Sequence, residues 1–249
     1  MLVRDGERAP EVLMLKRHTK SVFGDVHVFP GGVVDACDAA MEDCCDSVTS
    51  ADADRALGTG DALRHYSAAI RELFEETGVL LAHGAGDSGN TDAPPAGDTE
   101  RRGLIHGELQ WDRWVRERQL KLATRELHYF AHWVTPKSEP RRFSTRFFVA
   151  VMPANQEAMH DGVELTDSRW MTAQDVLEAQ RKRQMQLIYP TYRSLRDIAG
   201  FRSVAEIVGW ADERLRNGVA RVLPAIVEVD GKEKVILPGD PRYPAERPE

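Results

Sequence analysis

Short apolar runs and helically spaced apolar residues alternate along the chain, which predicts a mixed fold of strands and helices. Runs of apolar and β-branched residues predict strands at residues 1–4, 11–17, 26–29, 127–134, 147–152 and 162–171. Apolar positions at helical spacing predict helices at residues 68–78, 99–105, 109–120, 172–181, 190–198 and 204–217. Residues 221–228 and 234–237 are expected to form a hairpin that turns at Asp230–Gly231.

The helix predicted around residues 68–81, with the sequence AAIRELFEETGVLL, concentrates negative charge on one face. Glu72, Glu75 and Glu76 are spaced i, i+3 and i+4, so they share an arc about 100° wide. Asp61 is the expected N-cap of this helix, and Gly78 is its expected end. Like charges one turn apart destabilise a helix, so the cluster favours a bound divalent cation. A solvated acidic face is the alternative interpretation.

A tight turn precedes this helix in the chain. Phe29-Pro30-Gly31-Gly32 combines a rigid φ with two permissive glycines, which suits a turn that brings backbone close to a ligand. Together, FPGG and RELFEETGV resemble the Nudix box of the Nudix hydrolases, with Gly32 at the position of its opening glycine. The helix positions of the box correspond to Arg71, Glu72, Glu75, Glu76 and Gly78.

The resemblance includes one interruption of the box. Asp38 lies where the box has its intermediate acid, counted from Gly32, but thirty-two residues separate Asp38 from Arg71, where the box has seven. Either Asp38 is the equivalent acid, or an acid nearer the helix, such as Asp61, takes its place; the resemblance implies that this acid pairs with Arg71. Interrupted boxes of this kind are similar to those of the Nudix branch that includes a peroxisomal coenzyme A diphosphatase. The stretches VLMLKRH and RFSTRFF extend the resemblance to both sides of the box.

The resemblance implies a fold, a metal and a reaction. The implied fold is the α+β Nudix fold, an α/β/α sandwich with a mixed sheet between helices. The implied site for Mg²⁺ or Mn²⁺ consists of the Gly32 carbonyl and the carboxylates of Glu72, Glu75 and Glu76. The ion would activate water for cleavage of a P–O–P link. The catalytic base would be Glu72 or Glu164, with Glu157 in reserve for the latter.

Basic residues near the box are candidates for binding the substrate. Arg17 ends the second predicted strand, and Arg146 enters a strand within RFSTRFF, four residues after Arg142. In an extended chain Arg142 and Arg146 share a face that could grip a pyrophosphate or a terminal phosphate bidentately. Surface charge, or pairing with the acidic helix, is the alternative. The full set of substrate-binding candidates is Arg17, Gly31, Gly32, Arg71 and Arg146.

The interrupted box favours coenzyme A or an acyl-CoA as the substrate. The stretch LMLKRHTKSVFGDVHVFPGG matches the pattern of CoA-type enzymes only in part, because His18, Val22 and Gly24 depart from it. ADP-ribose, a nucleotide sugar and a dinucleotide are therefore alternatives within the enzyme class. A catalytically silent nucleotide-binding module is the alternative from another class, which loss of a helix glutamate would favour.

One domain is expected over residues 1–249, with insertions at about 39–60 and 83–120 and a helical and hairpin extension at about 181–249. Residues 39–46 are expected to form a helical turn or two, and residues 47–60 are too polar to bury much surface. The first insertion is either a substrate-selecting lid or a passive surface loop. In the second, Trp111 and Trp114 at helical spacing indicate core packing, with base stacking as the alternative.

Composition limits the partners and the compartment. A net charge of −7 disfavours nonspecific nucleic-acid binding, and no apolar run is long enough to span a bilayer, so we expect neither nucleic acid nor membrane as a partner. The resemblance implies a small-molecule diphosphate as the partner. The three cysteines are too few for a zinc site and odd in number, which indicates a reducing compartment, with the cytoplasm as the default location. The closing segment GDPRYP is a candidate contact in a homodimer.

Overall fold

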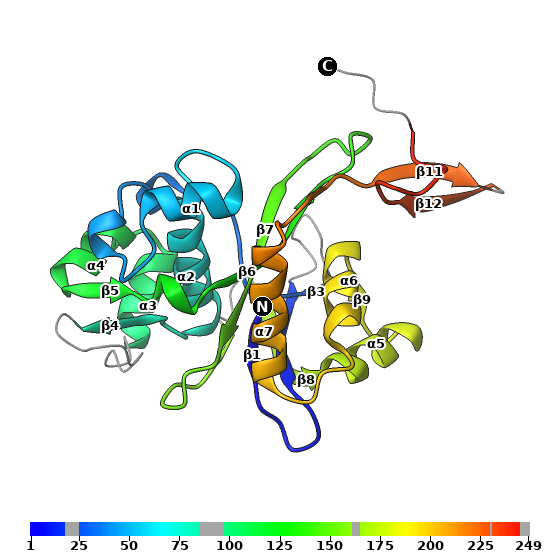
Figure 1. Ribbon diagram of the computed structural model, residues 1–249. Helices are drawn as coiled ribbons and strands as arrows, with labels where there is room; N and C mark the ends of the chain where they lie inside the picture. Colours follow the sequence, from blue (N-terminus) through cyan, green and yellow to red (C-terminus); the bar gives the residue numbers. More distant parts are fainter. Residues whose placement is uncertain (18–24, 85–96, 161–164, 230, 245–249) are drawn as a thin grey trace.

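A central mixed sheet separates two layers of helices in the computed structural model, which describes residues 1–17, 25–84, 97–160, 165–229 and 231–244 (Figure 1). The strands of this sheet are β1 (Leu2–Arg4), β2 (Glu11–Arg17), β3 (Val26–Val28), β6 (His128–Val134), β7 (Ser144–Val151), β8 (Leu165–Thr172), β9 (Gln186–Leu187) and β10 (Arg221–Val222). Their order is β10-β6-β7-β1-β2-β3-β9, with β8 also paired to β2. β1 is antiparallel to β2 but parallel to β7, so the sheet is mixed as expected.

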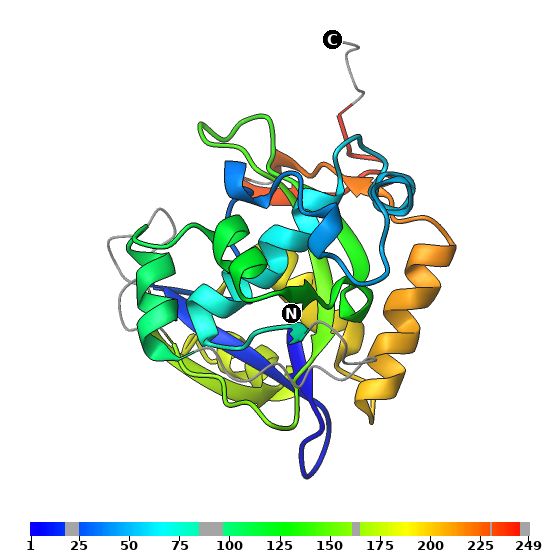
Figure 2. The ribbon, with the colours of Figure 1, turned by 90° about the vertical axis from the view of Figure 1, so that its left-hand side faces the viewer.

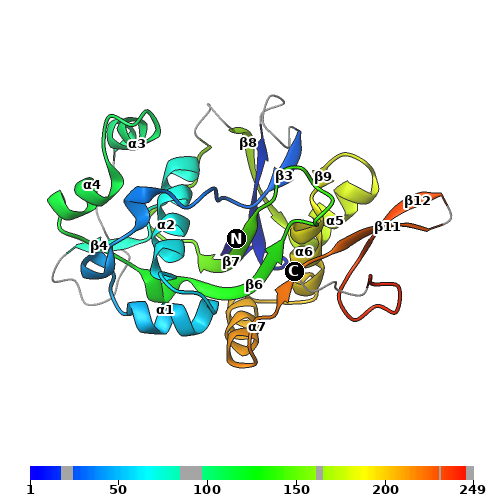
Figure 3. The same ribbon diagram turned by 90° about the horizontal axis from the view of Figure 1, so that it is seen from above.

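The two faces of the sheet are both buried, as the alternation in β2 shows. Leu13 and Leu15 pack into one core, whereas Val12 and Met14 pack into the other. Successive side chains of a strand point to opposite faces, so one short apolar run supplies both cores. Figure 3 shows the resulting sandwich from above, with helices on either side of the strands.

The first layer holds the acidic helix. Its elements are α1 (Ser50–Leu57), α2 (Leu63–Thr77), α3 (Asp98–Ile105), α4 (Trp111–Glu117), a small sheet of β4 (Ala82–Gly84) and β5 (Leu120–Leu122), and the 3₁₀ turns η1 (Ala36–Asp38), η2 (Glu42–Cys44) and η3 (Thr124–Glu126). Figure 2 shows this layer, coloured blue to green, facing the viewer. Trp114 stacks on Phe74 and on Trp111, with ring centroids 5.5 and 5.6 Å apart. Both tryptophans are therefore core residues, as expected.

The second layer comes from the C-terminal part of the chain. It comprises α5 (Ala173–Arg181), α6 (Tyr189–Ile198) and α7 (Val204–Arg216), and a two-stranded ribbon of β11 (Ala225–Val229) and β12 (Lys232–Ile236) lies beyond it. Thr172 caps α5, because its Oγ1 accepts a hydrogen bond from the backbone N–H of Asp175. No helix in the described part of the chain has both the length and the apolar character needed to cross a membrane.

The predicted start of the acidic helix was wrong. α2 begins at Leu63, and its N-cap is Ala62, which makes no side-chain cap. Asp61 instead adopts a left-handed conformation with φ of 56° and forms an ion pair with Arg64. The end is confirmed, since Gly78 closes the helix with φ of 76°, a value that glycine adopts without strain.

Two other expectations need correction. Residues 47–60 do bury surface, because α1 presents Ala53 and Leu57 to the core and Ala56 packs against it. The first strand of the predicted terminal hairpin is divided. Arg221–Val222 joins the main sheet beside β6, and only Ala225–Val229 pairs with β12.

Candidate active site

Helix α2 lies against the glycine turn that follows β3. The backbone N–H of Gly31 donates a hydrogen bond to Glu76 Oε2 at 2.8 Å, although the two residues are 45 positions apart. A Cβ atom on Gly32 would lie 2.5 Å from Glu72 Cδ, so only glycine leaves room for the Glu72 carboxylate here. Glu72 and Glu76 therefore face the glycine turn rather than bulk solvent.

Arg71 joins the acidic helix to the loop after the glycine turn. Its Nε and Nη2 donate to the two Asp38 oxygens at 3.0 and 2.9 Å, and Nη2 also donates to the Val33 carbonyl at 2.9 Å. Its Nη1 lies 3.0 Å from Glu72 Oε1 and 3.0 Å from Glu75 Oε2. One buried guanidinium thus fixes the positions of two helix glutamates.

The acid that pairs with this guanidinium is Asp38. Its side chain is completely buried, and it also accepts a hydrogen bond from Ser67 Oγ at 3.3 Å. Ser67 Oγ in turn accepts from Trp111 Nε1 at 3.0 Å. The alternative acid, Asp61, forms its exposed pair with Arg64. The first insertion therefore separates the two parts of the box in sequence but not in space.

Burial sets the electrostatics of the acidic face. It raises the pKa of Glu72 to about 7, with the charge of Arg71 opposing the rise and that of Glu75 adding to it. Burial alone would lower the pKa of Arg71, but its hydrogen bonds to Asp38 and the charge of Glu72 raise it instead. The site therefore combines a permanent cation with a carboxylate that can exchange a proton near neutral pH.

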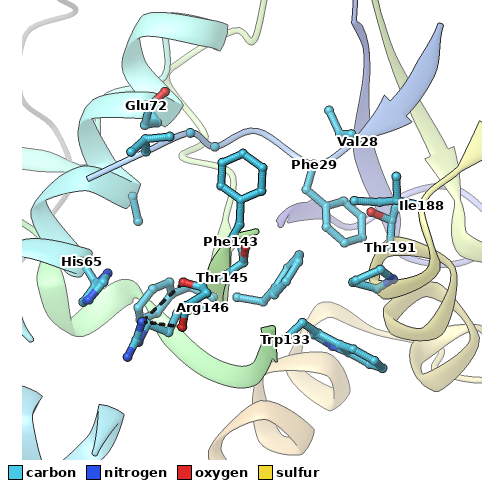
Figure 4. Close-up of a pocket in the computed structure, with 18 of the residues that line it drawn as sticks. Val28, Phe29, His65, Glu72, Trp133, Phe143, Thr145, Arg146, Ile188 and Thr191 are labelled. Carbon is cyan, nitrogen blue, oxygen red and sulfur yellow. Dashed lines mark hydrogen bonds between the residues drawn. The ribbon is translucent and has the colours of Figure 1, made fainter. Parts of the chain in front are cut away.

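A cavity of about 880 Å³ adjoins Glu72 and the glycine turn (Figure 4). Its apolar wall includes Phe29, Trp133, Phe143 and Ile188, which come from four separate segments of the chain. Its volume lies within the range of roughly 300–1,000 Å³ that is usual for sites of small molecules and cofactors. The cavity can hold a nucleotide-sized ligand with one end at Glu72.

The structure brings most of the predicted substrate-binding residues to this cavity. Arg17 lines it and donates from Nη2 to the Gly31 carbonyl at 3.5 Å, and Arg146 lines it from β7. Arg71 does not line the cavity; it contacts Glu72 and Glu75 instead. Glu164, the second candidate for the catalytic base, lies outside the described residues, and its reserve Glu157 is exposed.

Sequence reasoning missed His65 and the aromatic wall. His65 lies seven residues before Glu72 on α2, and both line the cavity because that spacing returns to the same helix face. This periodicity was the signal that could have identified His65. No comparable signal exists for Trp133 or Ile188, since only the tertiary fold brings these residues together.

The three cysteines are free thiols that serve packing. Cys44 and Cys45 are buried in the core of the first layer, and Cys37 packs against it. Burial raises the pKa of Cys37 to about 11 and that of Cys45 to about 12. They stay protonated at neutral pH, which disfavours both nucleophilic and zinc-binding roles.

The donors on the acidic face fit a divalent cation. Among the described residues, no three carboxylate, imidazole or thiol groups converge closely enough to hold a metal ion by themselves. Mg²⁺, however, is usually held by one or two carboxylates together with water and substrate phosphate oxygens. The Glu72 carboxylate, which lines the cavity beside the Gly32 backbone, is a hard oxygen donor of this kind, and the Glu76 carboxylate lies at the same turn.

Comparison with known proteins agrees with this geometry. A family profile described as the NUDT19 Nudix domain matches residues 46–198. The chain is 25% identical to the acyl-coenzyme A diphosphatase NUDT19 of Xenopus laevis, over 94% of this chain and 71% of that protein, and 25% identical to the Homo sapiens protein of the same name, over 93% and 72%. The crystal structure of a NUDIX hydrolase from Alicyclobacillus acidocaldarius matches with a TM-score of 0.71 and 26% identity, over 84% of this chain and 92% of that one. The chain therefore belongs to the Nudix hydrolases, in the family of the NUDT19 Nudix domain.

Proposed function

We propose that this chain hydrolyses the diphosphate link of coenzyme A or an acyl-CoA, releasing adenosine 3′,5′-bisphosphate and a 4′-phosphopantetheine. The observation that carries the proposal is the Glu72 carboxylate, which is held by Arg71 against Gly32 at the edge of a nucleotide-sized cavity. The relatives named acyl-coenzyme A diphosphatase align with more than nine-tenths of the chain, and this supports the choice of substrate. We further propose that the insertions and the C-terminal extension belong to a single Nudix domain over residues 1–249.

The acidic helix and the glycine turn would hold the metal. Glu72, Glu75, Glu76 and the Gly32 carbonyl are the proposed ligands of Mg²⁺ or Mn²⁺. When bound, such an ion draws charge from the phosphoryl oxygens and lowers the pKa of water. Arg71 keeps the ligand set in place through its contacts with Glu72 and Glu75.

The remaining chemistry belongs to side chains of the cavity. A water oxygen attacks one phosphorus atom while the bond from that phosphorus to the bridging oxygen breaks, and the bridging oxygen leaves with the other phosphate. Glu72 or Glu164 takes the proton of the attacking water. Arg17, beside the Gly31 carbonyl, is placed to neutralise charge on the leaving phosphate.

A panel of diphosphates tests the proposal. The kcat/KM values of coenzyme A, an acyl-CoA, ADP-ribose and NADH would be measured with Mg²⁺ and with Mn²⁺, and we expect the CoA compounds to rank first. Glu76→Gln should abolish turnover, whereas Glu117→Gln, which removes the same charge from the exposed surface of α4, should not. A first rank for ADP-ribose or NADH would refute the CoA assignment. Nucleotide binding without hydrolysis of any of the four would instead indicate a silent binding module.

A further inference from the structure

The charged side chains that line the cavity beside Glu72 are mostly positive. Five arginines line it among the described residues, namely Arg17, Arg64, Arg141, Arg142 and Arg146. The only acidic side chains among these lining residues are Glu72 and Glu139. An excess of positive charge in a concave, partly apolar site raises the local concentration of anions. The wall therefore favours a ligand that carries several negative charges.

Arg146 differs from the other arginines in its surroundings. Its Nε is buried and has no hydrogen-bond partner within the described part of the chain, and its Nη1 makes only long contacts of 3.4 Å to the Ser144 carbonyl and hydroxyl. Burial lowers its pKa, opposed by Tyr129 and assisted by Arg64. An arginine nevertheless keeps its charge in a protein, so an anion bound beside it would offset the cost of its desolvation.

The groups around Arg146 are neutral or positive. His132 is its cross-strand neighbour on β6, and His132 Nε2 lies 2.8 Å from Ser144 Oγ. Burial, together with the charge of Arg146, lowers the pKa of both His65 and His132 to about 4, so both imidazoles are neutral at pH 7. This part of the wall therefore offers one cation and neutral hydrogen-bonding groups, a combination that suits a phosphate.

This group of side chains lies away from the predicted metal ligands. His65 and Glu72 are two turns apart on α2, which corresponds to roughly 10 Å along the helix. The charge of Arg146 acts on His65, and Figure 4 shows the two residues on one part of the wall and Glu72 on another. A diphosphate held at Glu72 would therefore leave Arg146 to interact with a different part of the ligand.

We propose that Arg146, with His65 beside it, binds a second phosphate of the substrate, separate from the diphosphate that is cleaved. In coenzyme A this group is the 3′-phosphate, which the ribose separates from the diphosphate. The proposal rests on the proposed function and deepens it, because ADP-ribose and NADH lack this phosphate. Arg146 would thus be the residue that distinguishes CoA compounds from other diphosphates.

Equilibrium binding tests this subsite without turnover. The dissociation constants of adenosine 3′,5′-bisphosphate and adenosine 5′-monophosphate would be measured by calorimetry with the wild-type chain, Arg146→Gln and Arg113→Gln. Arg113→Gln removes the same charge from the exposed surface of α4, outside the cavity. We expect the wild-type chain and Arg113→Gln to favour the bisphosphate about 10- to 100-fold, the usual range for hydrogen bonds to a charged group, and Arg146→Gln to lose most of that preference.

Kinetics with coenzyme A and dephospho-coenzyme A provide the second measurement. Arg146→Gln should lower kcat/KM for coenzyme A by the same factor and leave that for dephospho-coenzyme A within about threefold of wild type. Equal affinity of the wild-type chain for the two nucleotides would overturn the subsite, and so would a preference that survives Arg146→Gln. If Arg146→Gln fails to fold, the ratio of the two dissociation constants of the wild-type chain still tests the proposal, because equal affinity for the two nucleotides overturns it. Failure of the proposed function would look different, since neither CoA compound would then be hydrolysed.

Discussion

Replacing Asp38 by Asn tests whether the interrupted box is rebuilt in space. The Asp38 carboxylate accepts two hydrogen bonds from Arg71, one from Ser67 Oγ and one from the backbone N–H of Asp35. The substitution keeps the volume but removes the charge, and it points an amide donor toward groups that already donate. Breaking one side of a buried ion pair costs about 3–5 kcal/mol. Arg71 keeps its contacts with Glu72, so we expect the lower end, about 3 kcal/mol.

Urea unfolding followed by circular dichroism measures this loss as a change in the free energy of unfolding. Asp61→Asn is the matched control, because Asp61 was the other candidate for the box acid and Asn tolerates its left-handed conformation. Its pair with Arg64 is exposed, and exposed pairs contribute at most about 1 kcal/mol. Asp38→Asn should also lower kcat/KM more than tenfold, since Arg71 positions Glu72. Equal stability of the two variants, or full activity of Asp38→Asn, would refute the assignment.

Two further predictions concern the glycine turn and the buried imidazoles. Gly32→Ala places a Cβ against the Glu72 carboxylate, so kcat should fall at least tenfold while the far-UV circular dichroism is unchanged; wild-type kcat would show that the close approach is unimportant. The pKa of His132 is about 4 in the folded chain and about 6.5 in the unfolded chain, so between these pH values the unfolded chain binds more protons. The stability that neutral His132 contributes is therefore complete above pH 6.5 and is lost as the pH falls toward 4. His132→Gln cannot gain this proton, so the free energy of unfolding of the variant should fall less with falling pH than that of wild type, by at most about 1.4 kcal/mol per pH unit. If the difference in unfolding free energy between the variant and wild type is the same at pH 7 and pH 5, the lowered pKa of His132 is contradicted.

The sequence predicted the acidic helix because its signals are local. Glu72 and Glu76 are adjacent on one helix face, and Gly78 closes the helix where expected. The glycine turn was also predictable, since FPGG carries its own conformational signal. The pairing between Asp38 and Arg71 was left open, because no local pattern decides a contact between residues 33 positions apart.

Other features depend on tertiary packing that sequence patterns do not record. Residues 47–60 were expected to bury little surface on grounds of composition, yet Ala53 and Leu57 of α1 are buried in the core. The short strand Arg221–Val222 was assigned to a hairpin because the Asp230–Gly231 signal is strong, and its partner β6 lies far away in the chain. The aromatic wall of the cavity likewise combines segments that no periodicity connects.

Binding of Mn²⁺ to the free protein, followed by electron paramagnetic resonance, tests the central claim most directly. The claim is that the glutamates of α2, with Glu72 and Glu76 at the glycine turn, hold a divalent ion together with water and substrate oxygens. We predict that the wild-type chain and Glu117→Gln bind Mn²⁺ with the same Kd, and that Glu76→Gln raises the Kd at least tenfold and abolishes hydrolysis of coenzyme A. Unchanged Mn²⁺ affinity and wild-type turnover in Glu76→Gln would contradict the account.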